Sequence, residues 1–106
     1  MKFQDISKWI LPVLGCIVAA LFFLDVLTTA LILGLGGYEM NPAMVPVVSN
    51  PYVHVVFKLV FACAIVLVAL YAERKMPLSG SALLGSVAVM YGFVIWNNVN
   101  ILWRYL

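Results

Sequence analysis

Two charged side chains of opposite sign lie inside long apolar stretches of this 106-residue sequence. Asp25 stands among Leu, Phe and Val residues, and Lys58 stands in a second apolar stretch further along the chain. A lone charge at the centre of a membrane helix costs about 2.5–3.5 kcal/mol on insertion scales. Since both charges fall at similar depths when their stretches are drawn as helices, we expect Asp25 and Lys58 to form an ion pair.

The Asp25–Lys58 pair has two interpretations. It can be a structural ion pair, with neighbouring amides and hydroxyls joining the helices by hydrogen bonds. It can also line a binding pocket or an ion path, because ionisable residues inside a membrane mark such sites. In the second interpretation, a ligand or a proton tips the balance between charged and neutral Asp25.

More polar residues lie at helical spacing from the pair or on the same side of the membrane. His54 is one turn before Lys58, and Thr28 and Thr29 are one turn after Asp25. The last apolar stretch adds asparagines, and a carboxylate in the first connection could cap a helix or reach His54 or an arginine. The candidate binding residues are Asp25, Thr28, Thr29, Glu39, Asn41, His54, Lys58, Asn97 and Asn98.

Catalytic, metal and cofactor motifs do not accompany these residues. Acid–base side chains are present without a nucleophile–base pair, so the sequence does not favour an enzyme. Asp25, Glu39 and His54 lack metal-ligand spacing, and we expect neither a metal nor a cofactor. Cys16 and Cys63 lie in apolar stretches without a CxxC motif and are interpreted as small core residues.

The composition indicates a membrane protein. The chain is 66% hydrophobic and 9% charged, far from the composition of soluble domains. Its mean hydropathy is +1.14. The net charge of +2 is too small and too scattered for nucleic-acid binding, so the lipid bilayer is the expected surrounding.

Three stretches are long enough to span a bilayer, at about 9–35, 51–72 and 80–104. We expect an all-α, polytopic fold in a single transmembrane domain over 1–106. The first connection, which contains an Asn-Pro pair at 41–42, predicts a short interfacial or re-entrant helix at about 41–48.

Helix start signals and basic residues complete the topology. Asn50 should cap the second span and Ser79 or Ser81 the third. Basic residues at Lys2, Lys8, Arg74 and Lys75 share one side, so the N-terminus should be cytoplasmic and the C-terminus outside. We expect the N-terminal residues to be retained as the start of the first helix and not cleaved as a signal peptide.

One combination of residues resembles an uncharacterised family of small prokaryotic integral membrane proteins with about three transmembrane helices. The pattern is D-x-x-T-T, then E-x-N-P, then K, and it consists of Asp25, Thr28, Thr29, Glu39, Asn41, Pro42 and Lys58. The resemblance implies that these residues form one shared feature. It also implies a prokaryotic cell (inner) membrane, and it brings no activity with it.

Small residues in the last span favour close contact between helices. They are Gly80, Ser81, Gly85, Ser86 and Ala88. Since three helices enclose little interior, we expect a homo-oligomer, either a dimer or a larger assembly.

Two functional hypotheses follow. The first is a protein that binds or transports a small polar solute or ion through an outer-half polar pocket, with proton coupling at Asp25. The alternative is a non-catalytic membrane subunit or assembly factor, whose polar residues are structural and dock a partner membrane protein.

Overall fold

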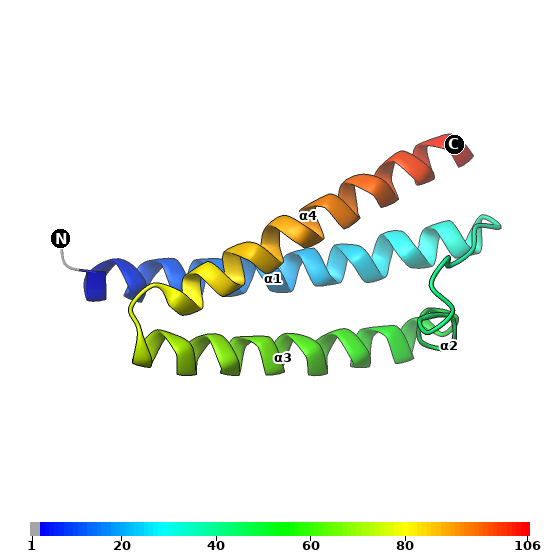
Figure 1. Cartoon of the computed structure of the whole chain (residues 1–106). Helices are drawn as coiled ribbons and strands as arrows, with labels where there is room; N and C mark the ends of the chain where they lie inside the picture. The colour runs from blue at the N-terminus through cyan, green and yellow to red at the C-terminus, as the bar shows by residue number, and fades with distance from the viewer. Residues whose placement is uncertain (1–2) are drawn as a thin grey trace.

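The structure is a computed structural model that describes the backbone of residues 3–106 and the side chains from residue 8 onward. It contains three long helices and one short helix after the first, as predicted (Figure 1). The helices are α1 (Phe3–Gly34), α2 (Val45–Val48), α3 (Pro51–Lys75) and α4 (Ser79–Tyr105).

The three long helices are apolar and long enough to cross a membrane, over Lys8–Gly34, Pro51–Lys75 and Ser79–Tyr105. Large apolar side chains on all three face outward, including Phe23, Val60 and Trp96, which are 65–67% exposed. On helices of this length and hydropathy, such a surface is typical of contact with lipid. The chain is therefore a small multi-pass membrane protein.

The helices run up, down and up, so that the bundle has two distinct ends (Figure 1). The connection between α3 and α4 lies at the same end as the start of α1, which we call the turn end. The α2 helix and the C-terminus lie at the other end, the α2 end. Lys8, Arg74 and Lys75 are thus at the turn end, whereas Lys2 lies outside the described residues.

At the turn end, α3 and α4 make a close contact. A Cβ atom placed on Gly80 would collide with the Ala69 carbonyl oxygen, so only glycine permits this approach. Ala69 and Leu84 are 0% and 1% exposed, and they form a core with Val18 of α1. Gly80 and Ser81 are therefore buried within the chain, so they are not available for contact with a second copy.

The start of α4 is capped by an acidic side chain from the preceding helix. The Glu73 carboxylate accepts a hydrogen bond from the Ser81 N–H at 3.1 Å, while the Ser79 hydroxyl donates to the Ala72 carbonyl at 2.7 Å. The predicted cap by Ser79 or Ser81 was wrong, since the residue preceding the helix is Leu78. Because the turn is tight, the Glu73 carboxylate lies close to the free N–H groups at the start of α4.

At the α2 end, one start signal acts as predicted and the other does not. Asn50 caps α3 by accepting a hydrogen bond from the Tyr52 N–H at 2.9 Å. The Asn41 side chain instead accepts from the Ala43 N–H at 3.1 Å, closing a local turn. The short helix consequently begins four residues later than expected, at Val45.

The two cysteines lie on the outer surface of the bundle. Cys16 and Cys63 are both exposed, so the interpretation as core residues was wrong. A thiol is apolar enough to face lipid as readily as a core. Hydropathy alone does not distinguish these two surroundings in a membrane protein.

Candidate functional site

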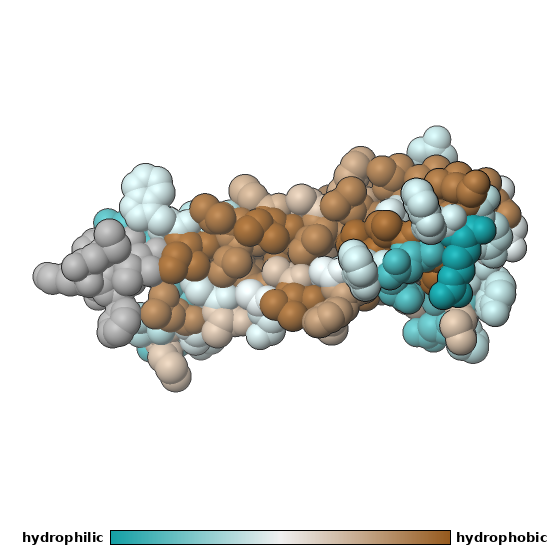
Figure 2. Space-filling model, turned by 90° about the horizontal axis from the view of Figure 1, so that it is seen from above, coloured by the Kyte–Doolittle hydropathy of each residue, from teal (hydrophilic) through white to brown (hydrophobic). Residues whose placement is uncertain are grey.

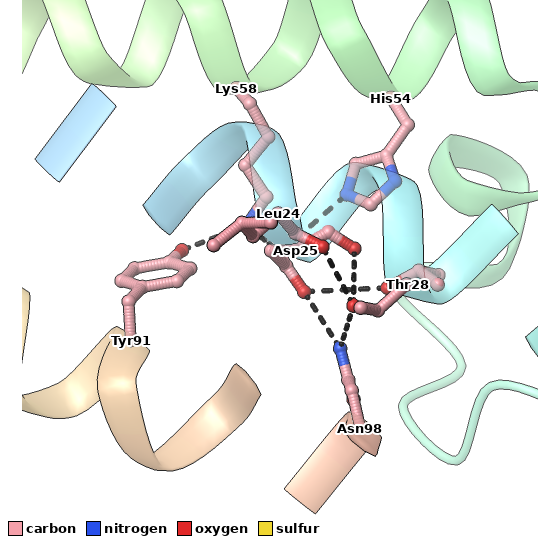
Figure 3. Close-up of polar contacts among 8 residues, drawn as sticks. Leu24, Asp25, Thr28, His54, Lys58, Tyr91 and Asn98 are labelled. Carbon is pink, nitrogen blue, oxygen red and sulfur yellow. Dashed lines mark hydrogen bonds and ion pairs between the residues drawn. The ribbon is translucent and has the colours of Figure 1, made fainter. Parts of the chain in front are cut away.

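The predicted ion pair between Asp25 and Lys58 is present and buried. The Lys58 Nζ lies 3.0 Å from the Asp25 Oδ2, and each side chain is 9% exposed. Asp25 is nine residues before the end of α1 and Lys58 seven residues into α3, which places both about 10–14 Å from the α2 end at a rise of 1.5 Å per residue. Figure 3 shows the two side chains meeting between α1 and α3.

Two aromatic residues complete the surroundings of Lys58. Its Nζ donates a hydrogen bond to the Tyr91 hydroxyl at 2.8 Å, and it lies 5.5 Å from the centre of the Phe22 ring. Neither residue was among the candidates. Helical spacing could have indicated both residues, because Phe22 precedes Asp25 by three residues and Tyr91 precedes Asn98 by seven.

The other oxygen of Asp25 is held by two hydrogen-bond donors. The Asn98 amide donates to Asp25 Oδ1 at 3.2 Å, and the Thr29 hydroxyl donates to the same atom at 3.3 Å. Asn98 also donates to the Thr28 hydroxyl oxygen at 2.9 Å, while Thr28 donates to the Leu24 carbonyl at 2.7 Å. Both carboxylate oxygens of Asp25 are thus engaged.

The imidazole of His54 lies beside this carboxylate. Its Nε2 is 3.8 Å from Asp25 Oδ2, and the residue is only 2% exposed. Within the described part of the chain, this nitrogen has no hydrogen-bond partner. A proton on Nε2 would place a second positive charge beside Oδ2, opposite Lys58.

These residues form one polar cluster that links all three long helices (Figure 3). We call it the Asp25 cluster, consisting of Asp25, Thr28, Thr29, His54, Lys58, Tyr91 and Asn98. Hydrogen bonds of this kind join helices in lipid, where an unpaired polar group is costly. The arrangement can hold a charge pair in an apolar surrounding, accept or release a proton, and offer amide and hydroxyl groups to a ligand.

A half-open groove of about 480 Å³ adjoins the Asp25 cluster at the α2 end. It runs between the end of α1, the connection after it and the end of α4. Its lining residues are Thr29, Ile32, Leu33, Gly37, Tyr38, Glu39, Met40, Asn97, Asn98, Ile101, Arg104 and Tyr105. Seen from above, hydrophilic surface gathers at this end of the molecule, whereas most of the remaining surface is apolar (Figure 2).

Thr29 and Asn98 belong to both features, since each lines the groove and each donates a hydrogen bond to Asp25. Asn97 and Glu39 line the groove without contacting Asp25. Glu39 is half-buried, and its Oε1 accepts a hydrogen bond from the Asn41 N–H at 3.1 Å. The Asn41 side chain itself is exposed and engaged in its own turn, so it belongs to neither feature.

The described residues contain no group of three His, Cys, Asp or Glu side chains arranged to hold a metal ion. Asp25 and His54 are close, but the third group beside them is the Lys58 ammonium. A cation entering between them would have to displace this lysine.

The fold and the site define a three-span membrane protein with a buried, ion-paired polar cluster beside a groove. The chain belongs to the family described as DUF5658, a domain of unknown function, whose model matches residues 16–105. This confirms the predicted resemblance to an uncharacterised family, and the match includes every residue of the Asp25 cluster. No curated protein and no solved structure matches the chain.

Proposed function

We propose that this membrane protein binds a small polar solute or ion in the groove and moves it past the Asp25 cluster. The observation that carries the proposal is that Thr29 and Asn98 each belong to two features, the groove and the Asp25 cluster. Both line the groove and both hold Asp25. A polar ligand that attracts either side chain therefore weakens the hydrogen bonds to Asp25.

The proposed coupling follows from the competition for Asp25. When Thr29 and Asn98 turn toward a ligand, Oδ1 loses its donors while Oδ2 keeps Lys58 at 3.0 Å. Oδ1, freed of its donors, is then an open acceptor for a proton or for a donor group of the ligand. His54, at 3.8 Å from Oδ2, is the neighbouring group that can exchange this proton.

The proposed orientation places the groove on the outer side of a prokaryotic inner membrane. Lys8, Arg74 and Lys75 gather at the turn end, and positively charged segments favour the cytoplasmic side. The N-terminus is then cytoplasmic and the C-terminus outside. An ion or solute reaches the groove from outside without crossing the bundle.

Transport is tested with purified protein in liposomes, using radiolabelled glycine, ethanolamine and rubidium ion as separate probes. We expect uptake of at least one probe above that of empty liposomes, and its loss on Asp25→Asn. The control is Arg74→Gln, which removes an exposed charge at the turn end and should transport normally. Normal uptake by Asp25→Asn would assign Asp25 a structural role, and failure of all three probes would contradict transport.

A second candidate function rests on the saturation of Asp25. Both of its oxygens are engaged by protein groups, as expected when a polar cluster only joins helices. The chain would then be a non-catalytic membrane subunit or assembly factor. Stoichiometric co-purification with a larger membrane protein from native membranes supports this function, whereas purification of the chain without any other protein contradicts it.

We also propose a homo-oligomer, a dimer or larger, formed through the outward side of α4. A Cβ atom placed on Gly85 or Gly92 would meet nothing within 4 Å, so both glycines leave room for a second helix. Cross-linking in mild detergent should trap a dimer or a larger species. A strictly monomeric chain across several detergents would contradict this proposal.

A further inference from the structure

The groove contains two opposite charges that do not neutralise each other. Glu39 and Arg104 both line it, yet no ion pair joins them in the part of the chain that the structure describes. Oε1 of Glu39 is held by the Asn41 N–H at 3.1 Å, which leaves Oε2 free for a ligand. A ligand that matches this groove therefore carries a positive and a negative group.

The middle of the groove is apolar. Ile32 and Leu33 come from α1 and Ile101 from α4. Tyr38 and Tyr105 line it nearer the helix ends, and tyrosines of this kind mark the level of lipid headgroups. The groove thus combines charged groups at the headgroup level with apolar residues below them, and the polar Thr29, Asn97 and Asn98 lie deeper still.

We propose that the groove binds the zwitterionic headgroup of an ethanolamine phospholipid. Glu39 accepts the ammonium group and Arg104 binds the phosphate, while the glycerol and first acyl carbons lie against Ile32, Leu33 and Ile101. The proposal rests on the groove being the ligand site of the proposed function, and it names the ligand class for that site. It does not require transport.

The choice of ethanolamine over other headgroups follows from the two charges. A phosphatidylglycerol headgroup offers Arg104 a phosphate but brings no cation to Glu39. A choline headgroup carries a positive charge without N–H donors, so it makes no hydrogen bond to the carboxylate. Of these three headgroups, only ethanolamine supplies both a phosphate and an N–H donor.

The test measures binding to the full chain in detergent by native mass spectrometry. The probes are short-chain phosphatidylethanolamine, phosphatidylcholine and phosphatidylglycerol, together with free phosphoethanolamine. We expect phosphatidylethanolamine to bind about tenfold more tightly than phosphatidylglycerol, as one charge-assisted hydrogen bond provides. Free phosphoethanolamine should bind more weakly than the lipid because it lacks contacts to the apolar residues.

Two variants separate the roles of the charges. Glu39→Gln keeps an oxygen for the Asn41 N–H, so the connection should fold normally while the preference over phosphatidylglycerol disappears. Arg104→Gln should weaken the binding of both phosphatidylethanolamine and phosphatidylglycerol by about tenfold. Arg74→Gln, which removes an exposed arginine at the turn end, should change neither.

The outcomes distinguish this inference from the proposed function. Equal binding of phosphatidylethanolamine and phosphatidylglycerol, or an unchanged preference in Glu39→Gln, overturns the zwitterion assignment. Free phosphoethanolamine binding as tightly as the lipid overturns the lipid as its source. If glycine, ethanolamine or rubidium uptake depends on Asp25 while no lipid preference exists, only this inference fails. A lipid preference without uptake rejects transport alone.

Discussion

The two halves of the bundle are held together by different means. At the turn end, Gly80 lets α4 approach the α3 backbone at Ala69, and Leu84 is 1% exposed. Toward the α2 end, α4 moves away from the other two helices (Figure 1), and the helices are joined there by polar side chains such as Lys58 and Asn98. The first half is closed by small and apolar residues, and the second is joined by long polar ones.

The difference shows how distance between helices determines which interaction is available. Lipid tails are as apolar as leucine, so burial from lipid adds little and helices associate by close contact or by hydrogen bonds. Close contact requires small residues, which the turn end has in Gly80 and Ala69. In the α2 half, Lys58 of α3 reaches the Tyr91 hydroxyl of α4 at 2.8 Å, and Asn98 of α4 reaches Asp25 of α1 at 3.2 Å. The divergence also creates the groove.

The largest expected effect comes from breaking the ion pair. Lys58→Met leaves Asp25 buried without its cation and should cost about 3–5 kcal/mol of unfolding free energy, measured by SDS-induced unfolding in detergent. The control is the double variant Lys58→Met with Asp25→Asn, which removes both charges and should recover most of the loss. A single variant as stable as the parent would show that the pair does not hold the α2 half together.

The next effect comes from the turn end. Gly80→Val forces α3 and α4 apart because any Cβ atom meets the Ala69 carbonyl, and it should cost about 1–3 kcal/mol in the same unfolding assay. Gly15→Val in α1 is the matched control, since its Cβ atom would meet nothing within 4 Å and it lies outside the proposed α4 interface. Equal losses in the two variants would contradict the close approach.

A smaller effect is expected from the amide that links α4 to α1. Asn98→Leu removes hydrogen bonds to Asp25 and Thr28 and should cost about 1–2 kcal/mol. Asn97→Leu, one residue earlier and exposed, should be nearly neutral. If both variants unfold at the same SDS concentration as the parent, the α2 half does not depend on this link.

The smallest effect concerns the single hydrogen bond to Lys58. Tyr91→Phe keeps the ring against Phe22 but removes the acceptor at 2.8 Å, and it should cost about 0.6 kcal/mol. Tyr71→Phe, at an exposed hydroxyl near the turn end, serves as its control. A loss as large as that of Lys58→Met would mean that Tyr91, and not Asp25, is the main partner of Lys58.

Much of the Asp25 cluster could be predicted because charges in an apolar stretch have few alternatives. Asp25 and Lys58 had to pair, and helical spacing placed Thr29 and His54 nearby. Tyr91 and Phe22 were missed because aromatic residues are equally compatible with lipid and with the cluster. Whether an aromatic side chain faces lipid or the Asp25 cluster depends on how its helix is rotated, and contacts with the other helices determine that rotation.

Local turn chemistry was harder to predict than the spans. Asn41 and Asn50 both precede proline, yet only Asn50 caps a helix. Glu73 caps α4 from the preceding helix, a contact that no sequence spacing at Ser79 or Ser81 indicates. Capping depends on which acceptor reaches the free N–H groups. In a tight turn, an acceptor from the preceding helix can lie closer to them than a side chain at the helix start.

By itself, the sequence determined that the chain is a multi-pass membrane protein, that it has three helices long and apolar enough to span the membrane, and that Asp25 pairs with Lys58. Length, hydropathy and the cost of a bare charge in lipid are sufficient for these conclusions. Only the tertiary structure decided that α4 diverges at the α2 end and that Glu39 and Arg104 share a groove there. Those features depend on how α4 crosses the other two helices, which follows from tertiary contacts such as those of Gly80 with Ala69 of α3 and Leu84 with the core, and not from any local pattern.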